Sequence, residues 1–89
     1  MNFNKLNSEL YTLQSPHKFA KKPTDFDKGY MKISNWLNDL CYHYEKKRLA
    51  NELSDENEFQ NLIEDYKTKI SQLEESEYKN GLLKAISEI

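Results

Sequence analysis

Two stretches of the chain place an apolar residue at every third or fourth position. The first stretch follows Pro23 and the second follows Asp55. Alternating spacings of three and four residues form one stripe on an α-helix, so the pattern predicts two long amphipathic helices. The stripe positions are Phe26, Tyr30, Ile33, Leu37, Leu40 and Tyr44 in the first stretch and Phe59, Ile63, Tyr66, Ile70 and Leu73 in the second.

Capping residues indicate where these two helices begin and end. Thr24 is a good N-cap, and Asp27 stands three residues later, where its side chain can complete a capping box. Ser54, Asp55 and Glu56 offer a similar N-cap signal at the start of the second helix. The Asn-Gly pair that ends at Gly81 is typical of a helix C-cap. We therefore expect helices over about residues 24–53 and 55–80.

Two shorter helices are expected at the ends of the chain, over about residues 3–14 and 82–89. Proline disfavours helical geometry in the residue before it and has no N–H to donate, so Pro16 should end the first helix. Residues 15–23 then form a basic loop. The apolar positions of the first helix are Phe3, Leu6, Leu10 and Leu13.

A short connection between two apolar stripes of similar length predicts an antiparallel helical hairpin. The two shorter helices would pack along it and complete an all-α bundle of three or four helices. The chain has 89 residues, which is room for one domain. A domain of this size buries only a small core, which gives marginal stability. We therefore expect the chain to gain further stability by self-association into a dimer.

Charge is distributed unevenly along the chain, although the net charge is only -2. Residues 1–54 carry nine Lys and Arg against six Asp and Glu, whereas residues 55–77 carry two against eight. This polarity favours packing of a basic helix on an acidic one. The mildly acidic total argues against a dedicated nucleic-acid binder, whose domain is usually strongly basic.

Residues that commonly catalyse reactions or bind metals and phosphates are scarce in this chain. The chain has one cysteine, two histidines and two glycines, and it contains no phosphate loop, nucleophile triad or zinc motif. We therefore predict no enzyme activity, no cofactor and no metal. Asp39 and His43 share a helix face and are interpreted as a plain surface pair, and Cys41 as a small apolar residue at the edge of the core. A single cysteine and the lack of a long apolar stretch predict a cytoplasmic protein without a membrane span.

Aromatic residues outside the stripes are candidates for binding another protein. Trp36 and His43 lie seven residues apart on one flank of the first long helix. Trp36 either packs against the first helix or a dimer partner, or is exposed as one of the aromatic residues that contribute most of the binding energy of an interface. Phe19 either pins the basic loop to the core, which we favour, or docks on a partner.

Charged residues are the remaining candidates. Lys18, Lys21 and Lys22 in the basic loop are a possible anion contact, although nucleic-acid binding would favour more arginines than Arg48 alone. The acidic second helix, including Glu74 and Glu75, could dock on a basic partner, and a solvated face is the simpler interpretation.

These observations predict a non-enzymatic protein–protein interaction module, such as an adaptor, inhibitor, chaperone or small phage- or plasmid-type regulator. Its partner would be another protein, and the chain would also form a homo-oligomer. Two alternatives stay open. One is a nucleic-acid-associated accessory protein that uses loop residues 17–22, and the other is a structural oligomeric subunit.

Overall fold

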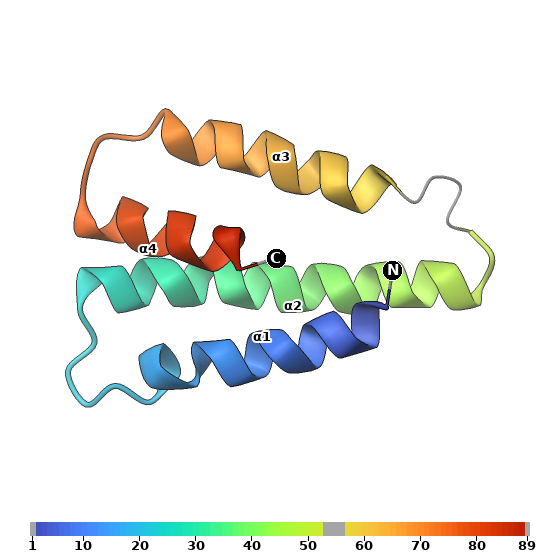
Figure 1. Cartoon of the computed structure of the whole chain (residues 1–89), viewed down its shortest axis with the longest axis horizontal. Coiled ribbons are helices and arrows are strands. Elements are labelled where there is room, and N and C mark those ends of the chain that lie inside the picture. The colour runs from blue at the N-terminus through green and yellow to red at the C-terminus, as the bar shows by residue number, and fades with distance from the viewer. Residues whose placement is uncertain (1, 53–56, 89) are drawn as a thin grey trace.

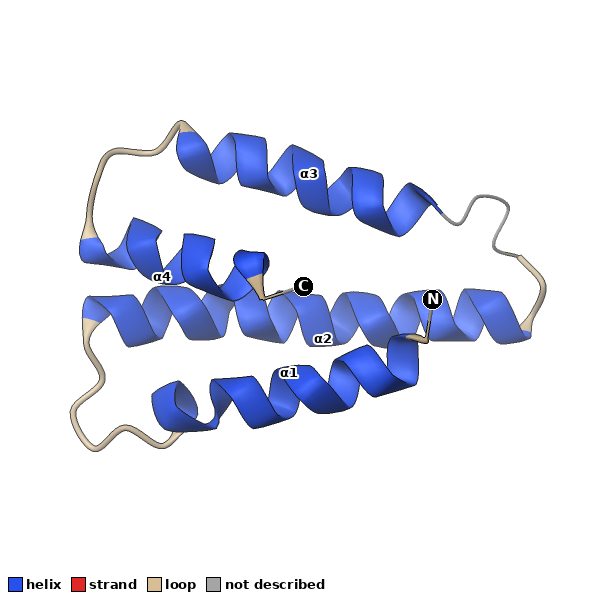
Figure 2. Ribbon diagram, in the orientation of Figure 1, coloured by secondary structure: helices blue, strands red, loops and turns tan. Residues whose placement is uncertain are grey.

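The computed structural model describes residues 2–52 and 57–88, and this part of the chain contains four helices (Figure 1). They are α1 (Phe3–Lys18), α2 (Asp25–Leu49), α3 (Asn57–Ser71) and α4 (Glu77–Ser87). Figure 2 shows no strand among the described residues. The prediction of an all-α helical bundle is therefore confirmed.

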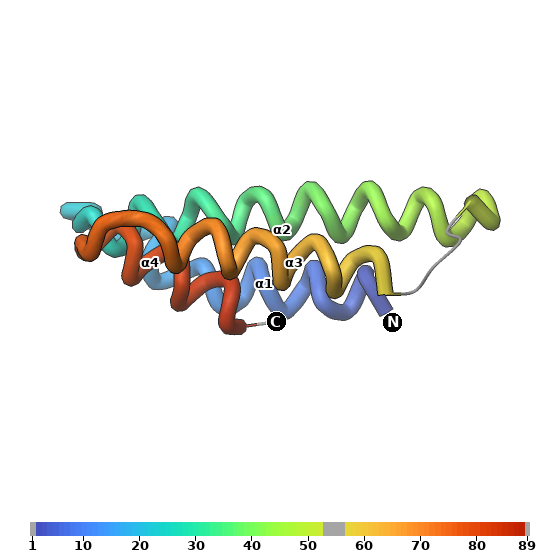
Figure 3. Tube along the Cα trace, turned by 90° about the horizontal axis from the view of Figure 1, so that it is seen from above, coloured from blue at the N-terminus to red at the C-terminus, as the bar shows by residue number. Residues whose placement is uncertain are grey.

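The longest helix, α2, runs along one side of the bundle, and the other three helices lie on its other side (Figure 3). α1 and α3 run antiparallel to α2, whereas α4 runs parallel to it (Figure 1). The sequence suggested α3 as the main partner of α2. In the structure α1 and α4 lie closest to α2, whereas α3 lies closest to α4 and meets α2 through aromatic side chains such as Trp36 with Tyr66. The result is a flat bundle with Cα extents of 42 × 28 × 14 Å.

Both ends of α2 have local signals in the sequence. The predicted capping box is present, because Asp27 N–H donates to Thr24 Oγ1 at 3.2 Å and Thr24 N–H donates to Asp27 Oδ2 at 2.9 Å. The helix ends four residues earlier than predicted. Asn51 has a left-handed backbone with φ 57°, and Glu52 N–H donates to the Lys47 carbonyl at 2.9 Å, which terminates the helix. The cap predicted for the next helix lies outside the described residues.

α1 continues through Pro16 for one more half-turn, so the predicted break at this proline is wrong. Proline in the last turn removes one backbone hydrogen bond, and contacts with α2 compensate for that loss. The buried side chain of Gln14 accepts a hydrogen bond from Ser34 Oγ at 2.9 Å. The ring of His17 stacks on Tyr30 with a centroid distance of 3.9 Å. The connection to α2 is correspondingly shorter than the predicted loop.

The single long helix predicted after residue 55 is wrong, because the chain breaks between α3 and α4. Ser76 caps α4 by accepting Lys79 N–H at 3.0 Å. Lys79 is 5% exposed, and its ammonium donates to the carbonyls of Ser71 (3.2 Å) and Leu73 (3.0 Å) and to the Glu75 carboxylate (2.5 Å). This ammonium satisfies carbonyl groups that the end of α3 leaves unpaired, so it stabilises the turn.

Gly81 lies inside α4, so its predicted role as a C-cap is wrong. A Cβ at this position would overlap the Phe26 carbonyl oxygen and lie 2.8 Å from the backbone nitrogen of Tyr30. On the facing helix, a Cβ at Gly29 would overlap the Tyr78 carbonyl oxygen. The backbones of α2 and α4 are therefore in direct contact, and the two glycines permit this approach.

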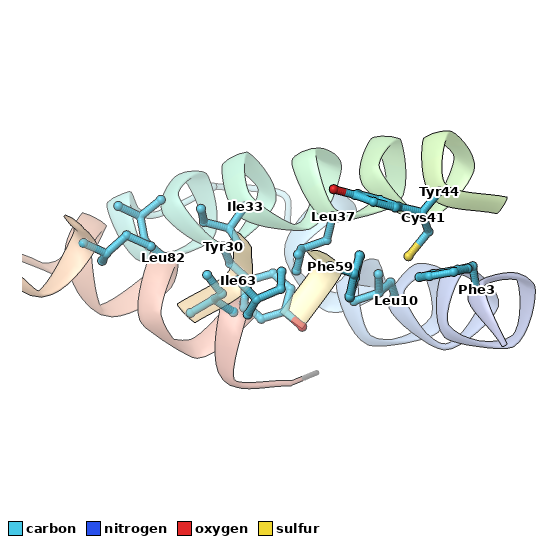
Figure 4. Close-up of a cluster of buried hydrophobic side chains, with 13 residues drawn as sticks. Phe3, Leu10, Tyr30, Ile33, Leu37, Cys41, Tyr44, Phe59, Ile63 and Leu82 are labelled. Atoms are coloured by element: carbon cyan, nitrogen blue, oxygen red, sulfur yellow. The ribbon is translucent and has the colours of Figure 1, made fainter. Parts of the chain in front are cut away.

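All four helices contribute side chains to one apolar core (Figure 4). Most of the predicted stripe positions are buried. The others are partly buried, except Leu13 and Leu73, which are 39% and 49% exposed. α2 buries a second row of residues, Ser34, Asn38 and Cys41, that the stripe did not include. The labelled core residues are Phe3, Leu10, Tyr30, Ile33, Leu37, Cys41, Tyr44, Phe59, Ile63 and Leu82.

Asp27 makes the junction of α1 and α2 sensitive to pH. Its carboxylate accepts the Thr24 N–H and lies 2.7 Å from His17 Nδ1, and these contacts lower the pKa of Asp27 below its ordinary value of 3.8. A carboxyl with a lowered folded-state pKa stabilises the protein above its unfolded pKa, and this contribution is lost as the pH falls through the folded pKa.

We therefore expect Asp27→Asn to lose part of the stability difference between about pH 6 and about pH 3. Urea unfolding at each pH, followed by far-UV circular dichroism, measures this difference. Asp25→Asn, in the same helical turn, is the matched control and should keep the wild-type dependence. An unchanged pH dependence in Asp27→Asn would contradict the assignment.

Candidate functional site

An aromatic pair lies where α2 and α3 face each other. The rings of Trp36 from α2 and Tyr66 from α3 have centroids 4.0 Å apart with an interplanar angle of 31°. Both side chains are partly buried against the core. Each sits beside a buried stripe residue of its own helix, Ile33 on α2 and Ile63 on α3. The helix periodicity therefore places the two rings at the margin of the core.

This pair forms one wall of an open groove of about 410 Å³. The groove is lined by Lys32, Ile33, Asn35, Trp36, Asp39 and Tyr66. Lys32 and Asp39 are exposed and place opposite charges along its edge. Lys69 Nζ lies 5.7 Å from the centroid of the Tyr66 ring. An aromatic centre with a charged edge is the usual composition of a protein-binding surface.

The predicted residue His43 lies on α2 beyond this groove and does not line it. Its ring is exposed and meets the Tyr44 ring edge-on at a centroid distance of 5.6 Å. Asp39 and His43 are both described, and the structure contains no hydrogen bond between them. Trp36 packs against Tyr66 of α3 and not against α1, so the expectation that it packs on the first helix is wrong.

Cys41 is fully buried and takes part in the core rather than lying at its edge. Burial raises the pKa of its thiol to about 11, and a thiol of this kind forms little of the reactive thiolate at neutral pH. Within residues 2–52 and 57–88, three or more His, Cys, Asp or Glu side chains do not gather in any place that could hold a metal ion.

The basic loop carries the most exposed large apolar side chain of the described residues. Phe19 is 73% exposed, so the prediction that it pins the loop to the core is wrong. Lys18 Nζ lies 5.6 Å from its ring centroid. Lys18, Lys21 and Lys22 are all exposed. These four side chains lie near the end of α1, apart from the Trp36 groove.

Glu74 and Glu75 lie in the connection between α3 and α4, and both are exposed. Glu75 is already paired with the buried Lys79 ammonium. The residues predicted to bind a partner therefore occupy separate places on the molecule. The sequence did not assign Tyr66 or Lys32 to a site. The signal for Tyr66 was its place on the α3 stripe, which indicated a core residue.

Comparison of the chain with protein-family models, with curated proteins and with solved structures gave no match. Among the described residues, the helices are all too short or too polar to cross a membrane.

Proposed function

We propose that the chain is a non-enzymatic protein-binding module of the adaptor, inhibitor, chaperone or small-regulator kind, and that the α2–α3 groove is its docking site. The observation that supports this proposal is the close, tilted pair of the Trp36 and Tyr66 rings, partly buried at the wall of an open groove. Tryptophan and tyrosine are enriched among the residues that contribute most to binding energy.

The groove suits one large apolar side chain of a partner. Such a side chain, placed against Trp36, would remove apolar surface from water on both molecules, at about 25 cal/mol per Å². Lys32 and Asp39 lie at the edge of the groove, where charges mainly set orientation and association rate. The partner surface would then carry an apolar anchor flanked by charges of both signs.

The test begins with a tagged chain expressed in the organism that encodes it, followed by identification and purification of the protein that co-purifies. Trp36 is the only tryptophan, so its fluorescence reports directly on the groove in a titration with that protein. We expect a shift of Trp36 emission on binding. Lys32→Glu should weaken binding by about 5- to 10-fold, which corresponds to roughly 1 kcal/mol.

Lys28→Glu is the matched control, because Lys28 is also exposed on α2 but does not line the groove. It should bind as the wild-type chain does. Trp36→Ala is a poorer variant, since Trp36 also packs on Tyr66 and its loss would disturb α3. Equal weakening by Lys28→Glu and Lys32→Glu, or binding that leaves Trp36 emission unchanged, would contradict docking in the groove.

A further inference from the structure

Two loops of opposite charge lie at the same end of the bundle. The α1–α2 connection and the α3–α4 connection are both at the left of Figure 1, on opposite edges of the flat molecule. We call the first, together with the last residue of α1, the basic corner, and the second, together with the first turn of α4, the acidic corner. The basic corner comprises Lys18, Phe19, Lys21 and Lys22, and the acidic corner comprises Leu73, Glu74, Glu77 and Tyr78.

The charges of the two corners are available to a partner. In the described part of the chain, Lys18, Lys21 and Lys22 form no ion pair, and neither Glu74 nor Glu77 is paired with a cation. Glu75 differs, since it pairs with Lys79 inside its own chain. The basic corner therefore presents three unpaired lysines beside one exposed carboxylate, that of Asp25, and the acidic corner presents two carboxylates that no cation neutralises.

Each corner also exposes large apolar side chains next to these charges. Phe19 is 73% exposed in the basic corner, and Leu73 and Tyr78 are 49% and 39% exposed in the acidic corner. Each corner thus combines an apolar contact with charges, and each charge pattern is the complement of the other. Both halves of a self-complementary interface are present on one chain.

We propose that two copies of the chain associate end to end through these corners. A two-fold axis parallel to the shortest axis of the molecule turns the second copy by half a turn in the plane of Figure 1. The basic corner of each copy then faces the acidic corner of the other, so the same contact forms twice. A two-fold axis along the vertical of that view would oppose like charges, and the charge pattern disfavours it.

The small size of the contact limits its strength. Across its two shorter axes the Cα trace measures 28 × 14 Å. The area of such an end is well below the roughly 800 Å² that a stable interface buries on each partner. The dimer is therefore a weak one that depends on concentration, and salt screening dissociates it. This inference is independent of the α2–α3 groove, so Lys32→Glu leaves the dimer intact.

Sedimentation equilibrium on the full chain tests the proposal, over about 10 µM to 1 mM protein, at low and high salt. The wild-type chain should approach twice its 10.6 kDa mass at low salt and return to the monomer at high salt. Lys21→Glu/Lys22→Glu and Glu74→Lys/Glu77→Lys should each weaken association by at least about 10-fold. Circular dichroism checks that both variants keep their helix content.

The decisive arm is a mixture of these two variants. One variant carries acidic charge at both corners and the other carries basic charge at both. The mixture should therefore form a heterodimer, whereas each variant alone should stay monomeric. Lys5→Glu/Lys46→Glu is the control, because it makes the same charge change on exposed residues of α1 and α2 outside both corners. It should dimerise as the wild-type chain does.

Three results would overturn the proposal. They are a wild-type chain that stays monomeric at every concentration, a mixture that forms no heterodimer, and a control that dissociates as readily as the corner variants. A monomeric wild-type chain that binds duplex DNA at low salt, and loses this binding in Lys21→Glu/Lys22→Glu, would instead assign the basic corner to nucleic acid.

Discussion

Replacing Gly81 with alanine should destabilise the fold by about 2 to 3 kcal/mol, even though alanine is intrinsically the better helix former by about 1 kcal/mol. The new Cβ would overlap the carbonyl oxygen of Phe26. That oxygen belongs to the backbone of α2 and cannot turn away as a flexible side chain can. Relief therefore requires α4 to move off α2, which opens the core around Leu82 and Ile86.

Urea unfolding monitored by far-UV circular dichroism measures this effect. The matched control is Asn80→Ala, at the neighbouring exposed position of α4, which should change stability by less than about 0.5 kcal/mol. A Gly81→Ala variant that is more stable than the wild-type chain would show that helix propensity outweighs packing here. The close approach of α2 and α4 would then be wrong.

Phe59→Ala should have the largest effect, a loss of about 3 to 5 kcal/mol. Phe59 is 1% exposed, and its ring lies 5.2 Å from that of Phe3 and 5.6 Å from that of Tyr44, by centroid distance. It therefore joins α3 to both α1 and α2. Small domains have a total stability of about 5 to 15 kcal/mol, so this one substitution removes a large share of it.

The same variant has a second readout. When α3 loosens, Tyr66 should leave Trp36 and the tryptophan emission should move to longer wavelength at low urea. Gln60→Ala, at the next and exposed position of α3, should leave both stability and emission near the wild-type values. A Phe59→Ala variant that unfolds with the wild-type midpoint would contradict the position of α3.

Local signals in the sequence predicted much of the helical structure. The spacing of Tyr30, Ile33, Leu37 and Tyr44 predicted the buried side of α2, and Thr24 with Asp27 predicted where the helix begins. Such features depend on residues within one or two helical turns. They are therefore encoded locally, whatever the rest of the chain does.

The errors arose where contacts between helices outweigh local preference. Pro16 was expected to end α1, but the contacts of Gln14 and His17 with α2 keep its last turn helical. Gly81 resembled a helix end, whereas it is the point where another backbone comes close. The break before α4 had two local signals, the N-cap Ser76 and the end of the apolar stripe at Leu73, but the Asn-Gly pair at Gly81 indicated a later helix end.

The candidate groove was only half predictable. Trp36 stood out as an aromatic residue beside the stripe of α2, so sequence alone could mark it as a candidate. Tyr66 occupies a stripe position on α3, and its pairing with Trp36 depends on how the two helices are placed in space. Phe19 and the charged loops were identified as candidates, but their position at one end of the bundle required the fold.

Site-specific photo-crosslinking in the organism that encodes the chain tests docking in the α2–α3 groove most directly. A photoreactive residue in place of Asn35 lies in the groove, and one in place of Lys28 lies on the same helix outside it. We expect one protein cross-linked from position 35, a weaker yield of this product in Lys32→Glu, and no such product from position 28. The same products from both positions, or none from position 35, would contradict it.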